Sequence, residues 1–246
     1  MIQRRVSAVL LLRDGFSGKT LTDGAGTRCL LDGRPLRRPI WKRDGYLVLT
    51  DLDAGEHVLE LQRSGYQTET VPLQVEGSAP IEDTVALKPG KGYRFPPETV
   101  RVTISLRRGG APAAGERIWM GMRSRQMLKL AQEKVSGGDC EARLFCEGNA
   151  ALMPIPGHFL LADGKVPELA YLRSLHDEAG EFAPPLQSDH GRGTELIPMQ
   201  AYALDGAGAV CVLLREPGTL TGFFAGKTFE AQLHAGEQAV EWVLEG

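Results

Sequence analysis

Residues 44–67 constrain the fold of this chain more than any other segment, because they contain two alternating stretches joined by turns. Residues 45–50 alternate as one strand, residues 52–56 supply a glycine-containing corner, and residues 57–62 alternate again. Gly65-Tyr66 follows where the next turn is expected. Period-two alternation bounded by glycine and aspartate is typical of antiparallel strands with one buried face. The segment therefore predicts a small antiparallel β-sandwich module.

Similar alternation recurs along the rest of the chain, which has 246 residues and an apolar content of 42%. This length and composition are those of a globular protein with one large domain or a few small ones. We expect the strands of the first module at residues 6–12, 40–41, 46–50, 57–62, 69–75 and 81–87. The chain is therefore predicted to be all-β, with tandem antiparallel β-sandwiches that are immunoglobulin-like or prealbumin-like and a first module at residues 1–90.

A stretch rich in proline and glycine, residues 88–97, follows the first module and is predicted to be a linker, because both residue types interrupt strands. A strand at residues 100–106 then opens a second β-rich region, residues 97–246. Glycine turns in that region predict several hairpins. Residues 125–135 also fit the spacing of a short helix, so strand and helix both stay open for this segment.

A short internal repeat links the two parts of the chain. The corner at residues 52–60 has an echo at residues 233–241 and a looser one at residues 155–164. Each copy is predicted to be a corner that leads into a strand, although chance similarity in a β-rich chain is the alternative. The second region is therefore expected to hold either two sandwiches split near residue 166, or one sandwich with long hairpin insertions.

Three motifs in the first module carry a family resemblance: Gly45-Tyr46, Leu52 with Gly55, and Gly65-Tyr66. In these motifs the chain resembles the carboxypeptidase regulatory-like, prealbumin-type family, whose members share a Gly-aromatic strand, a Leu-x-x-Gly corner and a closing Gly-Tyr. The resemblance covers roughly residues 1–90 and implies a β-sandwich. It also implies an accessory or binding domain rather than a catalytic one.

The net charge and the hydropathy of the chain argue against nucleic acid and membranes as partners. The net charge of −3 gives no general attraction to nucleic acid or to an acidic membrane surface, so neither is expected as a partner. No apolar run reaches about 18 residues, so no membrane span is expected. The apolar run at residues 6–12 is too short for a secretory signal and is better explained as a first strand. We therefore expect a cytoplasmic protein, or one released without a conventional signal peptide.

The residues that often carry catalysis or bind cofactors do not form a recognisable constellation. Residues 15–20 end in Gly-Lys-Thr, but Arg13 stands where a phosphate-binding loop needs its first glycine. No G-x-S-x-G motif occurs, and Cys211 lies in an apolar strand pattern. We therefore predict no catalytic residues, no cofactor and no enzymatic activity.

The cysteines and histidines give little indication of a metal site. The cysteines form no CxxC pair and are expected to be reduced, packed thiols: Cys29, Cys140, Cys146 and Cys211. The histidines of the second region are of a type that binds metal, and two of them have aspartate neighbours: His158, His176 and His190, with Asp177 and Asp189. Solvated loop residues are the favoured interpretation, so no metal site is predicted.

The strongest local surface feature is a basic stretch before the Gly-Tyr strand, which departs from the pattern of the resembled family. Five cations and an aromatic residue fall within ten positions: Arg34, Arg37, Arg38, Trp41, Lys42 and Arg43. Such a group is suited to docking an acidic protein, a phosphate or a glycan. The alternative is a solvated loop that Pro35 and Pro39 keep extended. These residues are the predicted partner-binding site.

The function favoured by these observations is that of a non-catalytic structural or protein-interaction protein. It is expected to be a subunit of a larger assembly, for example a phage tail-like or contractile particle. A carbohydrate-binding module is the first alternative, although Trp41, Trp119 and Trp242 are scattered in the sequence. A metal-dependent hydrolase that uses the hairpin histidines is the second.

Overall fold

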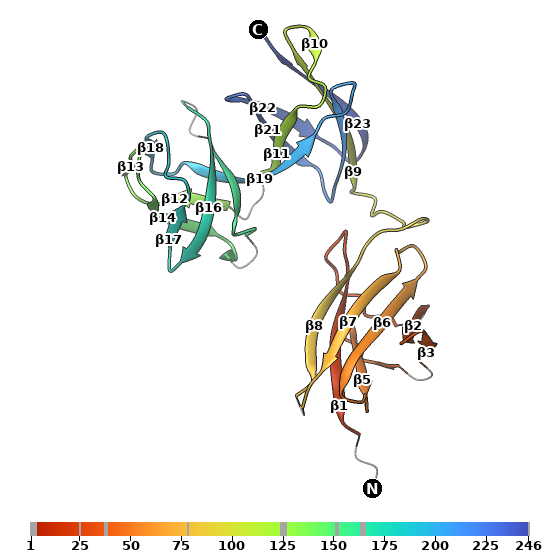
Figure 1. Ribbon diagram of the computed structural model, residues 1–246. Coiled ribbons are helices and arrows are strands. Elements are labelled where there is room, and N and C mark those ends of the chain that lie inside the picture. The colour runs from red at the N-terminus through yellow and green to blue at the C-terminus, as the bar shows by residue number, and fades with distance from the viewer. Residues whose placement is uncertain are drawn as a thin grey trace. The chain divides into compact units, whose positions relative to one another are not determined.

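A computed structural model describes residues 4–24, 26–36, 39–77, 79–123, 127–150, 153–162 and 166–245 (Figure 1). The elements of this part of the chain are strands, β1 to β23, which confirms the prediction of an all-β protein. The described residues contain no helix long and apolar enough to cross a bilayer. The chain divides into two compact units, Met1–Pro96 and Pro97–Gly246, and each is described by itself.

Two four-stranded sheets build the first unit. One has the order β4-β5-β1-β8 and consists of β4 (Ile40–Trp41), β5 (Tyr46–Thr50), β1 (Val6–Asp14) and β8 (Ile81–Leu87). The other has the order β3-β2-β6-β7 and consists of β3 (Arg34–Pro35), β2 (Thr27–Leu31), β6 (Gly55–Arg63) and β7 (Glu69–Val75). The sequence predicts antiparallel pairing throughout, but β8 pairs with β1 in parallel.

Alternate residues of both sheets meet in one core. The fully buried leucines come from β1, β5, β6, β7 and β8: Leu10, Leu12, Leu47, Leu49, Leu59, Leu61, Leu73 and Leu87. Burial of each such side chain contributes roughly 1.5–3 kcal/mol to stability. The first unit is therefore two sheets that enclose a shared core.

The segment after β8 is fastened to the first unit by Asp14. One carboxylate oxygen of Asp14 accepts hydrogen bonds from the hydroxyls of Tyr66 (2.8 Å) and Tyr93 (2.6 Å). The other accepts from the backbone amides of Phe16 (2.8 Å) and Ser17 (2.7 Å). Part of the predicted linker is thus packed on the first unit, and the loop after β1 is a turn closed by Asp14.

The second unit contains two larger sheets and a small one. In one sheet β9 (Val100–Arg108) pairs with β10 (Ala111–Pro112), with β20 (Ala209–Leu214) and, in parallel, with β23 (Gly236–Leu244). The nine-stranded sheet has the order β12-β14-β17-β16-β15-β19-β11-β21-β22. Its strands are β12 (Met127–Leu130), β14 (Glu141–Glu147), β17 (Ala179–Phe182), β16 (Glu168–His176), β15 (Gly157–Ala162), β19 (Glu195–Ala203), β11 (Arg117–Met122), β21 (Gly218–Phe224) and β22 (Lys227–Leu233). β13 (Lys134–Val135) pairs with β18 (His190–Gly191).

Six strands of the nine-stranded sheet close into a barrel, because β19 pairs with β15 on one side and with β12 on the other. The sequence predicts sandwiches in this region, so the barrel is a difference from the predicted tandem arrangement. The chain near residue 166 connects β15 to β16, which pair with each other, so it does not separate two sandwiches. The helix considered for residues 125–135 is wrong, since β12 and β13 occupy its described part.

β19 belongs to both halves of the second unit (Figure 1). Its residues Glu195 to Met199 pair with β15 in the barrel, and its residues Gln200 to Ala203 pair with β11. The barrel encloses its own core around Phe159 and Phe182. A second core lies between the β9 sheet and the strands β11, β21 and β22, with Ile104 and Leu106 among its fully buried residues.

The three copies of the internal repeat occupy equivalent places in their strands. Gly55, Gly157 and Gly236 are the first residues of β6, β15 and β23. Gly55 and Gly236 have positive φ angles of 132° and 99°, a conformation that glycine adopts without a steric cost. Each copy is thus a corner that leads into a strand.

Candidate functional site

The predicted partner-binding stretch crosses from one sheet of the first unit to the other. Arg34 lies in the edge strand β3, whereas Trp41 lies in β4, at the edge of the opposite sheet. Lys42 and Arg43 are exposed in the turn that leads to β5. Arg37 and Arg38 lie outside the described residues. Among the described members, Arg34 therefore belongs to a different sheet edge from Trp41, Lys42 and Arg43.

Trp41 packs against the core of the first unit. Its side chain is half-buried and contacts the core cluster. Its ring also lies directly over Gly24, where an added Cβ would come within 2.2 Å of the indole. The indole therefore fills space inside the unit, and the exposed part of the stretch near β4 is cationic.

An apolar surface lies beside Trp41, on the outer side of the sheet β4-β5-β1-β8. Five side chains point away from the core and form what we call the outer face: Val9, Leu11, Ile40, Tyr46 and Val48. They lie opposite one another in the strand register, with Val9 paired to Val48, Leu11 to Tyr46 and Ile40 to Val48. All five are half-buried, and the shared core is formed by the alternate residues.

This outer face is unusual because a sheet that is covered on one side only normally presents polar residues on the other. The opposite sheet of the same unit follows the usual pattern, since Glu60 and Gln62 alternate with the buried Leu59 and Leu61 in β6. Strands with apolar residues on both faces are typical of sheets that are covered by a layer on each side. The outer face therefore has the composition of a buried surface.

The charges at the two edges of this face have opposite sign. Glu82 and Asp83 are exposed on β8, and together with Val9, Leu11, Tyr46 and Thr84 they line a shallow hollow of about 340 Å³. Across the sheet, the turn between β4 and β5 exposes Lys42 and Arg43 next to a single acid, Asp44. In the strand register Glu82 is level with Val9 on the outer side of the sheet, whereas Asp83 is level with the core residue Leu10, so β8 brings one acid to the outer face.

The outer face had a signal in the sequence. Residues 8–12 read Ala-Val-Leu-Leu-Leu, a continuous apolar run that exceeds what a strand with one solvated face needs. Continuous runs of this kind are typical of strands buried on both sides. The prediction identified this run as a strand and did not use its second face.

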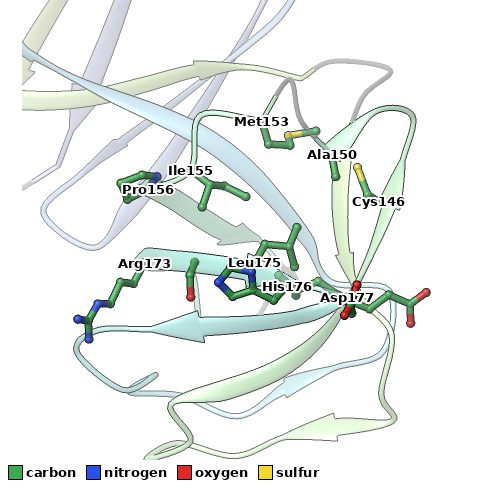
Figure 2. A pocket seen from close by; sticks show the side chains of 12 residues that line it. Cys146, Ala150, Met153, Ile155, Pro156, Arg173, Leu175, His176 and Asp177 are labelled. Atoms are coloured by element: carbon green, nitrogen blue, oxygen red, sulfur yellow. The ribbon is translucent and has the colours of Figure 1, made fainter.

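A larger pocket of about 550 Å³ lies at one end of the barrel (Figure 2). Its floor includes core residues such as Leu144 and Met153, and Ile155 and Leu175 add apolar walls. The polar residues that line it are Arg173, Ser174, His176, Asp177 and Glu178. The strand register shifts between Leu172 and Ser174, so Arg173 stands at a bulge of β16, and its guanidinium lies 3.2 Å from Glu181.

Cys146 also lines the barrel pocket (Figure 2). Burial raises the pKa of this thiol above its ordinary value, so the thiol is protonated near neutral pH and is a weak nucleophile. All four cysteines are free thiols, but the prediction that they are packed is wrong for Cys140 and Cys211, which are exposed. Cys211 lies in β20 with its side chain on the outer side of the strand, whereas its neighbour Val212 is buried in the core.

The three histidines considered as metal ligands have separate surroundings. His176 lines the barrel pocket, whereas the buried His190 lies 3.1 Å from Glu168, which also accepts hydrogen bonds from two backbone amides. The ring of His158 lies between those of Trp119, to which it is tilted by 43°, and Tyr171, which it meets edge to face at 63°. In the described part of the chain, no group of three or more His, Cys, Asp or Glu side chains is placed to hold a metal ion.

The rings around His158 form an aromatic row that the sequence analysis missed. Trp119 of β11 lies 4.3 Å from the His158 ring, and Tyr171 of β16 lies 4.9 Å on its other side. Burial lowers the pKa of His158, so the imidazole is neutral at physiological pH. These residues are far apart in the sequence, and the pairing of β15 with β16 and of β19 with both β15 and β11 brings them together.

Comparisons with known proteins identify no family. No family model matches the chain, and no curated protein sequence matches it. Three solved structures align with 9% identity: the major pilin subunit BcpA of Bacillus cereus (TM-score 0.28, 99% of both chains), the Bacillus anthracis TIE protein (TM-score 0.24, 98% of this chain and 51% of that one) and a leucine-rich repeat protein from Bacteroides thetaiotaomicron (TM-score 0.18, 99% and 26%). Alignments at these TM-scores establish no common fold, so the resemblance to the carboxypeptidase regulatory-like family stays a prediction.

Proposed function

We propose that the chain is a non-catalytic interaction protein that works as a subunit of a larger assembly. The observation that carries this proposal is the outer face of the first unit, where five apolar side chains stand on the solvent side of a sheet. Contiguous apolar surface on a soluble domain marks a site of contact with another molecule. Covering a half-buried side chain of this size contributes on the order of 1 kcal/mol.

The finer fold assignment belongs to the same proposal. We infer that the first unit is a β-sandwich of the prealbumin type, as the family resemblance implies. Support comes from its two four-stranded sheets with a shared core, and from Gly65-Tyr66, which lies in the turn after β6. Modules of that family are usually accessory or binding domains, which agrees with an interaction role.

The test is Val48→Lys, which places a charge in the centre of the outer face without touching the core. Val58→Lys is the matched control, because Val58 is 44% exposed on the outer side of the opposite sheet. In gradient sedimentation of gentle lysates from native cells, we expect the unmodified chain and Val58→Lys in heavy fractions and Val48→Lys in light ones. The proposal fails if all three sediment as free chains, or if Val48→Lys stays in the heavy fractions.

Glycan binding is a second candidate, and the aromatic row favours it. Half-buried rings of Trp119 and Tyr171 on neighbouring parts of one sheet are the kind of side chains on which sugar rings stack. In tryptophan fluorescence titrations with a panel of soluble glycans, we expect saturable quenching that Trp119→Phe abolishes and Trp41→Phe retains. Absence of saturable quenching by every glycan in the panel contradicts this candidate.

A further inference from the structure

We propose that the free edge of β20 accepts an extended segment of a partner protein, which adds a strand to the sheet β10-β9-β20 and places apolar side chains in the hollow beside it. This inference goes beyond the proposed function, because it concerns the second unit and a different kind of contact. It is drawn from the backbone of β20 and from the side chains that line the hollow.

The first observation is an unpaired backbone edge. Among the described residues, β20 pairs with β9 alone. The amide of Leu106 in β9 donates to the carbonyl oxygen of Gly208 (2.9 Å), so in the antiparallel register every second residue of β20 from Val210 onward bonds to β9. The N–H and C=O groups of Cys211 and Leu213 therefore point away from β9, and no described residue pairs with them. Such an edge is a template for an added strand.

The second observation is that this edge lacks the usual protection. Edge strands commonly carry charged residues or proline, which disfavour pairing with another chain. Three other strands that end their sheets follow this rule: β7 has Glu69 and Pro72, β8 has Glu82 and Asp83, and β22 has Lys227 and Glu230. β20 reads Ala-Val-Cys-Val-Leu-Leu and has neither a charge nor a proline. Its edge is therefore suited to an uncharged segment.

The third observation is an apolar hollow of about 400 Å³ on the core side of β20. Val212 and Leu214 line it from β20, and Met122, Tyr202 and Leu220 line it from β11, β19 and β21. Because side chains alternate across a strand, a strand added to β20 points every second side chain to the same side as Val212, toward this hollow. Strand addition takes its affinity from main-chain hydrogen bonds and its specificity from pockets for alternate side chains.

The edge and the hollow together describe a segment that has no sheet of its own. If a second copy paired its β20 with this one, its Val212 would stay buried in its own core and would leave the hollow unfilled. A free segment with apolar residues at alternate positions satisfies both the edge and the hollow. The partner is therefore an extended, uncharged segment, such as a chain terminus or a loop, of another protein.

Fluorescence anisotropy of the purified full-length chain tests the site with a labelled, capped peptide of alternating valine and threonine that ends in lysines. With the valines in the hollow beside Val212, the threonines lie opposite Cys211 and Leu213, and the threonine N–H groups face β20. Methylation of the threonine nitrogens is expected to weaken binding about tenfold or more, because it removes these hydrogen bonds. Methylation of the valine nitrogens, which face away from β20, is expected to change the affinity less than about threefold. Equal binding of the two methylated peptides, or no saturable binding of the unmodified one, overturns the proposal.

A variant of the chain tests the same edge from the other side. Leu213→Pro removes one outward N–H and spares the bonds to β9, so the unmodified peptide is expected to bind about tenfold more weakly. Leu213→Thr is the matched control, because it keeps the N–H and a residue favoured in strands, and is expected to bind within about threefold of the natural chain.

Hydrogen exchange reports on the edge without any substitution. At saturating peptide, the amides of Cys211 and Leu213 are expected to exchange about tenfold more slowly or less, because they become hydrogen-bonded. The amide of Val212 is already bonded to β9 and serves as the internal reference. Unchanged exchange at both Cys211 and Leu213 contradicts strand addition and would mean that the peptide only fills the hollow.

Self-association and the proposed function are tested separately. In sedimentation equilibrium, a monomer–dimer equilibrium that Leu213→Pro abolishes would show that a second copy takes the edge, and would overturn the choice of partner. Val48→Lys lies in the first unit and is expected to leave peptide binding unchanged. A peptide that does not bind, while Val48→Lys still leaves the heavy fractions of the lysate, removes this inference and leaves the proposed function standing.

Discussion

The carboxylate of Asp14 holds two segments of the first unit in place through four hydrogen bonds. Burial alone would raise its pKa, but hydrogen bonds from Tyr93, Ser17, Tyr66 and Phe16 outweigh this, and the pKa lies below its ordinary value. Burial and the hydrogen bond to Asp14 raise the pKa of Tyr66 to about 12. At neutral pH the carboxylate is therefore ionised and both hydroxyls are donors. The loop after β1 and the segment after β8 are held by the same group.

His57 performs a similar role at the corner before β6. Its Nδ1 lies 2.7 Å from the carboxylate of Asp32, and its Nε2 lies 3.0 Å from the carbonyl oxygen of Asp53. Both partners are acceptors, so the ring satisfies both only as the doubly protonated imidazolium. The hydrogen bond to Asp32, followed by that to Asp53, raises the pKa of His57 above 6.5.

A raised pKa in the folded state makes stability depend on pH in a definite direction. The contribution of His57 is complete below the unfolded pKa of about 6.5 and is lost as the pH rises through the folded pKa. Urea unfolding between about pH 6 and pH 8.5 is therefore expected to show a midpoint that falls more steeply for the natural chain than for His57→Gln. Parallel curves for the two chains would show that the ring is not protonated in the fold.

At the scale of elements, hairpins with two-residue turns recur in both units. Four pairs of strands are joined by two residues that both have positive φ: Asp32-Gly33, Gly109-Gly110, Asp177-Glu178 and Ala225-Gly226. Two-residue turns of this kind match the right-handed twist of the strands, and they favour Asn-Gly, Asp-Gly and Gly-Gly. Alanine at position 225 departs from this preference.

Ala225→Asn is expected to stabilise the second unit. Alanine at a φ of 48° costs about 1 kcal/mol, whereas asparagine tolerates this conformation. We expect the free energy of unfolding to rise by about 0.5–1 kcal/mol, and the melting temperature to rise by about 2–4 °C. Ala225→Val is the control, since a β-branched residue at positive φ lowers stability. An asparagine variant with unchanged or lower stability contradicts the expectation.

Elements with local signals were predictable from the sequence, and those that depend on distant pairing were not. β5, β6 and β7 follow from alternation, because each has buried residues at every second position of its buried stretch. β2 and β3 were not predicted, because neither shows this alternation. The Gly226-Lys227-Thr228 triplet has the same three residues as the end of a phosphate-binding loop, but here Gly226 ends a hairpin turn and Lys227 and Thr228 begin β22. The barrel had no local signal, because its closure depends on the pairing of Leu128 with Leu196.

At the scale of the whole molecule, the two units differ in how their candidate sites arise. The outer face of the first unit is encoded locally, in the unbroken apolar run of β1 and the matching residues of β5, so a search for strands with two apolar faces would have found it. The barrel pocket and the aromatic row are products of topology. Their side chains come from strands such as β11, β15 and β16, and their meeting can be read only from the register.

β19 has a consequence for how the second unit can be divided. The first part of β19 pairs with β15 in the barrel, and its second part pairs with β11. Because both parts belong to one continuous strand, unfolding of the barrel or of the neighbouring sheet would break hydrogen bonds in the other. The barrel is therefore an inseparable extension of its neighbour rather than a removable insertion. A deletion that excised it would leave β11 with a bare edge, and the shortened protein would be open to strand exchange and aggregation.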